Sequence, residues 1–199
     1  MNIIWHGHSC FEITGKDGTI VFDPYQANSV PGLNSLKLKA NLVLCSHEHD
    51  DHNAKNCVEI TPKDFKVACI ETYHDHHQGS HRGKNTIHIV DFENLKVVHM
   101  GDIGCMMDDV SKLKNCDVLM IPIGGYYTID TKEALKYIER IQPRIVIPMH
   151  YRSHEFGYDV LSTNEGFIQK SSNIVYVDGY LEVHKETKGQ TIVFKKPRN

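Results

Sequence analysis

Residues 42–52 read Leu42-Val43-Leu44-Cys45-Ser46-His47-Glu48-His49-Asp50-Asp51-His52, an apolar run followed by the pattern H-x-H-x-D-H. Side chains alternate along an extended segment, so His47 and His49 point the same way and can share one metal ion. Asp51 and His52 break this alternation and can reach a second ion, as in two-metal hydrolytic sites. A solvated polar loop is the alternative interpretation. The stretch therefore predicts a strand that ends in a metal centre.

The composition favours one small domain that acts on small molecules. The chain has 199 residues, of which 40% are hydrophobic, so we expect a single domain over residues 1–199. A net charge of −3 and the absence of a long basic run argue against nucleic acid or an anionic membrane as the main partner. Neither a signal-peptide pattern nor an apolar run of membrane-spanning length occurs, so we expect a cytoplasmic protein. The oligomeric state leaves no signal in the sequence.

Six cysteines are scattered along the chain without a C-x-x-C pair, at positions 10, 45, 57, 69, 105 and 116. Several lie inside apolar runs, which predicts free, mostly buried thiols in a reducing compartment. Cys105 is the exception, because it lies beside a predicted element of the site.

Short apolar runs separated by polar turns predict strands along most of the chain. Residues 25–39 contain Pro31, Gly32 and several Asn and Ser, and we expect a mobile loop there. Asp130 and Glu133 have capping-box spacing and begin a predicted helix that Pro143 ends. A weaker helix is predicted near residues 164–170. The predicted strands are 2–5, 10–14, 19–22, 42–45, 67–70, 86–90, 96–100, 118–121, 144–148, 174–177, 180–184 and 191–194.

Polar residues follow three of these strands within a few positions. His47, Asp102 and His150 each lie just past a strand end, and such ends collect ligands in one crevice of an α/β sheet. His150 would join Asp51 and His52 on the second ion, and Asp102 could bridge both ions with its two oxygens.

A third histidine is needed to complete the set begun by His47 and His49. His74 is the candidate, and His76, His77 and His81 are close enough in sequence to take its place. Zinc-type catalytic sites need several neutral imidazoles or carboxylates for each ion, together with an open position for water. This requirement favours one of these four histidines as a ligand.

Several further residues have two interpretations. Asp23 and His8 could hydrogen-bond ligating imidazoles and fix their tautomers, or serve in turns. Arg82 could pair with an anionic substrate group or support a glycine-rich turn. Tyr151 and Thr128 border the predicted crevice, where they could hydrogen-bond a substrate or simply pack.

Eight segments in order resemble the metallo-β-lactamase-fold hydrolases, and within them a small branch of Zn-dependent hydrolases related to L-ascorbate-6-phosphate lactonase. The resemblance covers nearly the whole chain. It is carried by Trp5-His6-Gly7-His8-Ser9, Phe22-Asp23-Pro24, His47 to His52, Tyr73-His74-Asp75, Arg82-Gly83-Lys84-Asn85, His99-Met100-Gly101-Asp102, Pro122 to Thr128, and Pro148-Met149-His150-Tyr151.

The resemblance implies an α/β fold, a four-layer αββα sandwich, with metals at one edge. It implies two divalent ions, zinc first and manganese or iron as alternatives, that act on a small molecule such as a lactone or phosphoester through a bridging hydroxide. His47, His49 and His74 would hold the first ion, Asp51, His52 and His150 the second, and Asp102 would bridge them. Asp51, Asp102 and His150 are the expected catalytic residues. An anionic substrate would suit Arg82.

Two other functions compete with the hydrolase. A non-catalytic metal-binding protein or sensor would use the same ligands without turnover. A diiron oxidoreductase of this superfamily would carry H-x-E-x-D-H, whereas this chain has His49 at the Glu position and no flavin-binding partner domain. The sequence therefore favours hydrolysis over electron transfer.

Overall fold

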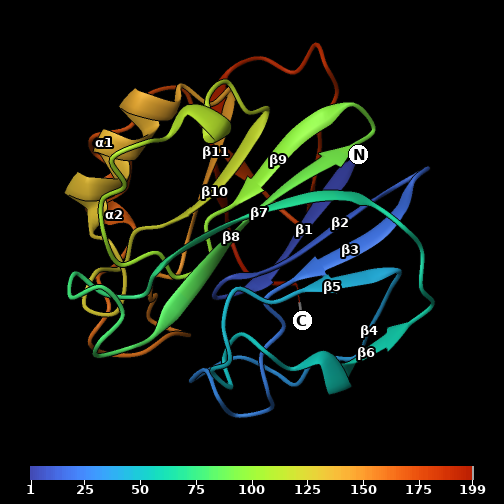
Figure 1. Ribbon diagram of the computed structural model, residues 1–199, viewed down its shortest axis with the longest axis horizontal. Coiled ribbons are helices and arrows are strands. Elements are labelled where there is room, and N and C mark those ends of the chain that lie inside the picture. Colours follow the sequence, from blue (N-terminus) through green and yellow to red (C-terminus); the bar gives the residue numbers. More distant parts are fainter. Residues whose placement is uncertain (199) are drawn as a thin grey trace.

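Two β-sheets face each other at the centre of the molecule, which a computed structural model describes for residues 1–198 (Figure 1). The first sheet has five strands in the order β13-β1-β2-β3-β5. Its strands are β1 (Asn2–Gly7), β2 (Cys10–Gly15), β3 (Gly18–Phe22), β5 (Leu42–Leu44) and β13 (Tyr180–Glu182). β1, β2 and β3 are antiparallel neighbours, whereas β5 runs parallel to β3.

The second sheet has seven strands in the order β12-β14-β11-β10-β9-β8-β7. β9, β10, β11, β14 and β12 run parallel, and β8 and β7 continue the sheet as antiparallel strands. The strands are β7 (Lys66–Tyr73), β8 (Lys84–Phe92), β9 (Leu95–His99), β10 (Val118–Pro122), β11 (Ile145–Met149), β12 (Ile174–Val177) and β14 (Gln190–Phe194). Every residue of β10 and β11 is buried, as expected for central parallel strands covered on both faces.

Helix α1 (Thr131–Ile141) connects β10 to β11 and, with the short α2 (Glu165–Ile168), lies beside the seven-stranded sheet on the side away from the other sheet (Figure 1). The predicted capping box is confirmed, because Asp130 accepts from the Glu133 N–H and the Glu133 side chain accepts from the Asp130 N–H. The helix ends at Gln142, whose left-handed backbone precedes Pro143. The arrangement is an αββα sandwich with few helices.

Apolar side chains from both sheets fill the space between them. Trp5 on β1 is 1% exposed and stacks on Tyr151, with ring centroids 5.6 Å apart. Its ring also lies 6.2 Å from that of Phe194 on β14, so an indole from the five-stranded sheet packs against the seven-stranded sheet. Such ring contacts add to the burial of apolar area that holds the two layers together.

Most predicted strands are confirmed to within a few residues, and two short strands are additional. β4 (Leu38–Ala40) and β6 (Val58–Ile60) form a parallel pair, with the 3-10 turn η1 (Lys55–Cys57) beside it. The other 3-10 turn is η2 (Ser111–Leu113). The predicted helix near residues 164–170 is confirmed as the short α2.

The segment 25–39, which was expected to be a mobile loop, packs several of its side chains into the hydrophobic core. Tyr25, Val30, Leu33 and Leu36 are all buried. All six cysteines are free, as predicted, but only Cys10 and Cys116 are buried and Cys69 is exposed.

Within residues 1–198, no helix has the length and apolarity needed to cross a membrane.

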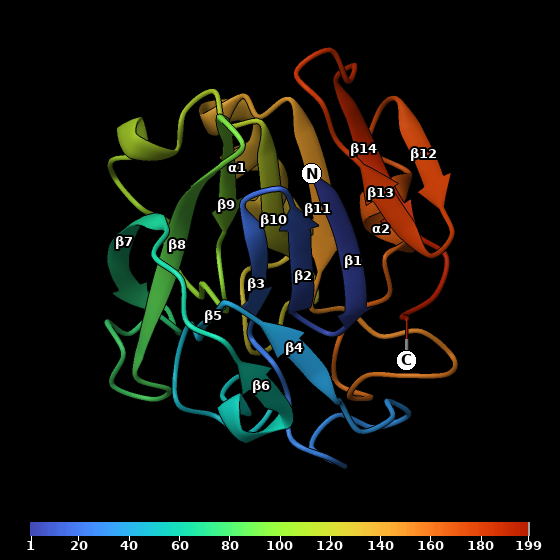
Figure 2. The ribbon, with the colours of Figure 1, turned by 90° about the vertical axis from the view of Figure 1, so that its right-hand side faces the viewer.

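The ends of several strands lie at one edge of the sandwich. Figure 2 shows the arrowheads of β9 and β11 pointing toward the lower edge, where the connecting loops gather. The backbone N–H of Thr86 on β8 donates to the Ser46 carbonyl just after β5, which ties the two sheets together near this edge. Residues that follow β5, β7, β9 and β11 are thereby brought close together.

Candidate metal centre

One buried carboxylate organises the loop that follows β5. Asp23 Oδ1 accepts the Ser46 backbone N–H at 2.7 Å, and its Oδ2 accepts the Ser46 hydroxyl at 2.7 Å. His52 Nδ1 lies 2.9 Å from the same Oδ2 and donates to it. Burial opposes the ionised form, but His52 more than offsets burial and lowers the pKa of Asp23. The prediction that Asp23 fixes an imidazole tautomer is confirmed.

The same network reaches a second imidazole. The Ser46 hydroxyl donates to Asp23, so it accepts from His47 Nδ1 at 2.9 Å. Both His47 and His52 therefore carry a proton on Nδ1, so that in the neutral form of each ring the lone pair is on Nε2. Neither Nε2 atom has a hydrogen-bond partner. Asp23 thus orients two imidazoles, one directly and one through Ser46, so that the Nε2 atom of each faces the centre.

Asp102 lies where the two sheets come closest at this edge. Its backbone N–H donates to Asn85 Oδ1 at 2.8 Å. The preceding Gly101 has φ +55°, and a Cβ there would lie 2.4 Å from both Asn85 Oδ1 and Ser46 Cβ. Only glycine allows this approach without displacing the ends of the sheets.

The carboxylate of Asp102 contacts imidazoles from three segments. Its Oδ2 lies 3.0 Å from His150 Nε2, 3.1 Å from His52 Nε2 and 3.4 Å from His74 Nε2. Burial opposes ionisation, but His150 and His52 hold the pKa of Asp102 well below its usual value. A carboxylate shared in this way can bridge two ions.

His74 follows β7 in a loop that is held by its neighbour Asp75. The Asp75 carboxylate accepts backbone N–H groups from four residues of the loop, namely His77, Gly79, His81 and Arg82. Among the four candidate histidines, the structure brings His74 to the centre, where it is 2% exposed. His76, His77 and His81 are exposed on the outer side of the loop.

His150 and Asp51 complete the arrangement. His150 follows β11 in a left-handed conformation with φ 51°, and its backbone N–H donates to the His8 carbonyl at 3.2 Å. Asp51 Oδ2 lies 3.2 Å from the Tyr158 hydroxyl, which donates to the Ser29 carbonyl at 2.6 Å, and 3.3 Å from His8 Nε2. His8 does not hydrogen-bond an imidazole, so the prediction that it fixes a tautomer is wrong.

The predicted ligands fall into overlapping groups whose candidate ligand atoms lie within 4.8 Å of one another. Bonds of about 2.0–2.2 Å at tetrahedral angles place two ligand atoms about 3.4 Å apart, which matches the Asp102 contacts. Buried nitrogens without hydrogen-bond partners are costly unless something else satisfies them. The donor set therefore fits divalent cations. The groups are His47, His49 and His74; His8, Asp51, His52 and His150; and His47, His52 and Asp102.

The protonation states favour a cation at this position. Burial lowers the pKa of His47 to about 3, and burial also lowers the pKa of His74, so both rings are neutral at pH 7. Burial opposes a charge on His52 as well, but Asp102, Asp51 and Asp23 raise its pKa well above the usual value. Without a metal, three carboxylates thus favour the protonated, positively charged form of His52, and a bound cation would take the place of that positive charge.

A cavity of about 220 Å³ opens directly onto these groups. Arg82 is a cationic side chain on its wall, and its guanidinium lies 4.2 Å from the ring centroid of Tyr127. This cation–π contact keeps the Arg82 guanidinium at the wall of the cavity. The lining residues are His49, Asp51, His74, Arg82, Asp102, Tyr127, His150 and Tyr158.

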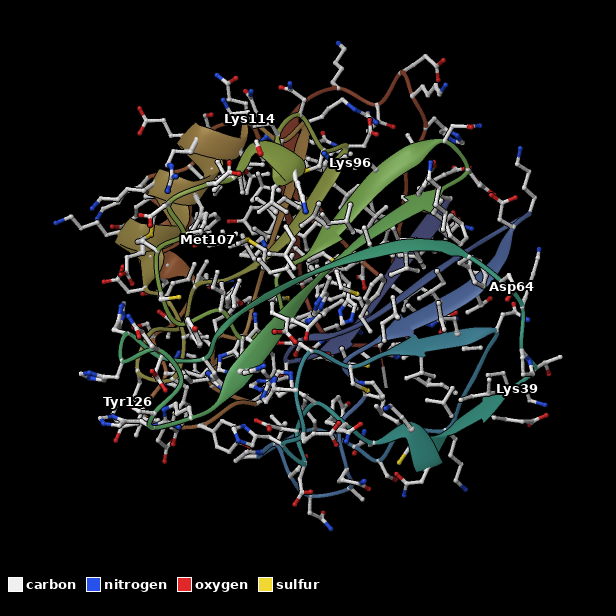
Figure 3. The ribbon with its side chains drawn as sticks, viewed as in Figure 1. Lys39, Asp64, Lys96, Met107, Lys114 and Tyr126 are labelled. Carbon is white, nitrogen blue, oxygen red and sulfur yellow. The ribbon has the colours of Figure 1, made fainter. Side chains whose placement is uncertain are left out.

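Some of these cavity residues were not predicted from the sequence. Tyr158 and Tyr127 line it, whereas the predicted Tyr151 is buried against Trp5 and Thr128 lines a neighbouring cavity. Figure 3 labels Tyr126 at the outside of the molecule, where it is 69% exposed. Two adjacent tyrosines thus face different surroundings, which no pattern in Pro122 to Thr128 distinguishes.

Comparisons with known proteins assign the chain to a family. The sequence profile of the family described as "Beta-lactamase superfamily domain" matches residues 2–150. A UPF0173 metal-dependent hydrolase of Staphylothermus marinus is 31% identical over 190 residues, covering 74% of this chain and 82% of the relative. One from Thermoplasma acidophilum is 29% identical over 192 residues, covering 78% and 85%.

A solved structure supports the same assignment. The crystal structure of a Thermotoga maritima protein of the metallo-β-lactamase superfamily aligns over 97% of both chains with a TM-score of 0.78 and 26% identity. The fold predicted from the resemblance is confirmed. The chain belongs to the metallo-β-lactamase superfamily and, within it, to the UPF0173 metal-dependent hydrolases.

Proposed function

We propose that the chain is a dinuclear hydrolase of small molecules. His47, His49 and His74 would hold one divalent ion, Asp51, His52 and His150 the other, and Asp102 would lie between them. The observation that carries the proposal is the position of Asp102 Oδ2, within 3.4 Å of imidazoles from three separate segments. Imidazole and carboxylate ligands suit zinc best here and also accept manganese or iron.

The bound ions would supply a water molecule of lowered pKa and polarise the acceptor oxygen of the substrate. The residues around them have separate tasks. Asp51 receives and orients a proton, because its carboxylate lines the cavity and its Oδ2 lies 3.2 Å from the Tyr158 hydroxyl oxygen. Asp102 stays ionised and lies 3.0 Å from His150 Nε2, so the two side chains fix each other's positions at the end of the cavity where the reaction would take place.

The cavity supports a small substrate that carries an anionic group. Its volume of about 220 Å³ accommodates a small organic molecule. Arg82 offers a planar guanidinium whose hydrogen-bonding edge suits a carboxylate or phosphate, while Tyr127 packs on its face. A lactone such as ascorbate 6-phosphate stays a prediction from the resemblance, and a phosphoester fits the same description.

The competing function is a non-catalytic metal-binding protein or sensor. Such a protein needs ligands, but it does not need a cavity beside them. Here His49 and Asp51 both line a cavity that also holds a cationic side chain, and this favours turnover over storage. The diiron oxidoreductase is disfavoured because an imidazole, His49, occupies the position of the expected carboxylate.

Metal removal and reconstitution test the proposal. The purified protein would be stripped with a chelator, reloaded with zinc, manganese or iron, and assayed on lactones and phosphoesters. We expect turnover to disappear on stripping and return with metal, and His49→Ala to lack it. Full activity of the metal-free protein would contradict hydrolysis at this centre. Tight binding of two ions without turnover of any substrate would favour the sensor.

A further inference from the structure

His8 is a buried imidazole at the metal centre that the seven predicted ligands leave without a role. It lies in the turn between β1 and β2, and its side chain is completely buried. Neither ring nitrogen has a hydrogen-bond partner. A buried imidazole normally satisfies at least one ring nitrogen, so this one needs an explanation.

The position of the His8 ring matches that of a ligand. Its candidate ligand atom lies within 4.8 Å of those of Asp51, His52 and His150. Nε2 is 3.3 Å from Asp51 Oδ2 but lacks hydrogen-bond geometry toward it. Two ligands of one ion with bonds of about 2.1 Å at tetrahedral angles lie about 3.4 Å apart, so the spacing of these two atoms fits neighbours around a common ion.

The backbone around His8 is built to hold the ring there. His8 has φ 53°, which is unfavourable for a side chain with a Cβ, and it follows Gly7 with φ 109°. Its carbonyl accepts the indole N–H of Trp5 at 3.1 Å and the backbone N–H of His150 at 3.2 Å. The His8 ring packs on the His150 ring with centroids 4.1 Å apart. Strain of this kind persists where surrounding contacts enforce it, commonly at functional sites.

We propose that His8 is a further protein ligand of the second ion, together with Asp51, His52 and His150. This inference rests on the proposed dinuclear function. It would make the two metal positions unequal, because the first has three imidazoles of which His49 is exposed, while the second has an additional buried imidazole. The second ion would then be held more tightly and keep fewer open positions, and substrate would meet the first ion more readily.

The alternative is that His8 only donates a hydrogen bond to Asp51. Cobalt titration of the metal-free protein separates the two roles. His8→Ala removes both functions, whereas His8→Gln keeps a hydrogen-bond donor and loses the imidazole. His88→Ala is the matched control, because His88 is also buried with an unpartnered Nδ1 and belongs to none of the ligand groups.

We expect His8→Ala and His8→Gln to weaken one cobalt equivalent by about 10-fold or more and to change its visible spectrum. The control should bind both equivalents as the wild type does. Wild-type affinity and spectrum in His8→Gln would overturn the proposal. If the wild type binds only one equivalent, the dinuclear function fails, and the effect of the His8 variants on that equivalent still decides whether His8 is a ligand.

A measurement on the wild type covers the case in which the variants do not fold. Nitrogen-15 spectra of the histidine rings would be recorded with and without zinc. A coordination shift at one ring nitrogen of His8, of the same size as that at His150, supports ligation. An unshifted His8 ring in the zinc-loaded protein overturns it.

Discussion

The two sheets contribute to the metal centre in different ways. The five-stranded sheet supplies four of the seven predicted ligands from a single loop, His47 to His52, which follows β5. It also carries the additional proposed ligand His8 in the turn between β1 and β2. The seven-stranded sheet supplies three, one each after β7, β9 and β11. The first group is positioned by hydrogen bonds within a few residues, and the second by the register of neighbouring strands. One half of the site is therefore encoded locally and the other by topology.

Each half also has a buried carboxylate that supports the ligands without being one of them. Asp23 orders the loop after β5 through Ser46 and His52. Asp75 orders the loop after β7 through four backbone N–H groups. Asp23 contacts a ligand directly, whereas Asp75 acts on the backbone beside His74. This difference predicts that substitutions in the two halves change activity and metal affinity by different amounts.

Asp102 joins the two halves, and its loss should have the largest effect. Asp102→Asn removes the negative charge that faces three imidazoles and should lower kcat/KM by roughly a thousandfold, equivalent to several kcal/mol of Lewis-acid stabilisation. Metal content and kinetics would be measured together. Asp91→Asn, on the exposed part of β8, is the control, and near-normal activity of Asp102→Asn would refute the bridging role.

Asp23→Asn should have the next largest effect. An amide would place donor hydrogens against the Ser46 N–H or His52 Nδ1–H, so both imidazoles would lose their fixed tautomers. We expect metal affinity to fall by about 10–100-fold, as when groups that orient metal ligands are lost. Competition with a chromophoric chelator measures this. Asp75→Asn should weaken affinity less, and an equal loss in both variants would erase the proposed difference between the halves.

Arg82 tests whether the loop after β7 also selects the substrate. Arg82→Gln should raise KM for anionic substrates about 10-fold or more, because one charge-assisted hydrogen bond is lost, and leave metal content unchanged. Arg82→Lys should recover part of the loss, since it keeps the charge without the planar contact to Tyr127. The same increase in KM for a neutral ester would argue against recognition of charge.

The smallest expected effect concerns acid stability. Burial opposes ionisation of Asp75, but backbone N–H groups of its own loop hold its pKa at about 2, below the usual 3.8. Its folded-state pKa is depressed, so its contribution to stability is present above pH 3.8 and is lost as the pH falls through about 2. In metal-free protein, the melting-temperature difference between wild type and Asp75→Asn should shrink between pH 5 and pH 2. A constant difference would contradict this account.

The locally encoded half of the site was the more predictable one. The H-x-H-x-D-H pattern contains its ligands in order, and Asp102 and His150 were predicted because each follows an apolar strand. His74 could not be separated from His76, His77 and His81 by sequence, because the choice depends on how the Asp75 turn directs four nearby side chains. The role of Ser46 was missed, since a serine between a cysteine and a histidine has no distinctive pattern.

The less predictable parts depend on contacts between distant segments. Residues 25–39 have no periodic apolar pattern, yet Leu33 packs on Gly7, and the Pro31 carbonyl accepts the Gly157 N–H at 2.9 Å. The short strands β4 and β6 were also missed, because a strand of three residues is too short to show the alternation of apolar and polar residues. They are recognised only by their pairing with each other. Tyr158 reaches Asp51 from 107 positions away, which only the folded chain reveals.

The order of the ligands along the chain has a consequence for biosynthesis. In the proposed dinuclear site, the imidazole ligands of the first ion would end at His74, whereas the second ion would also need His150, which is synthesised later. His150 follows β11, which lies between β10 and β14, so its position depends on pairing with strands that come before and after it in the chain. We therefore expect the second ion to bind only after β11 has paired with its neighbours, so that its binding would report that the seven-stranded sheet has formed.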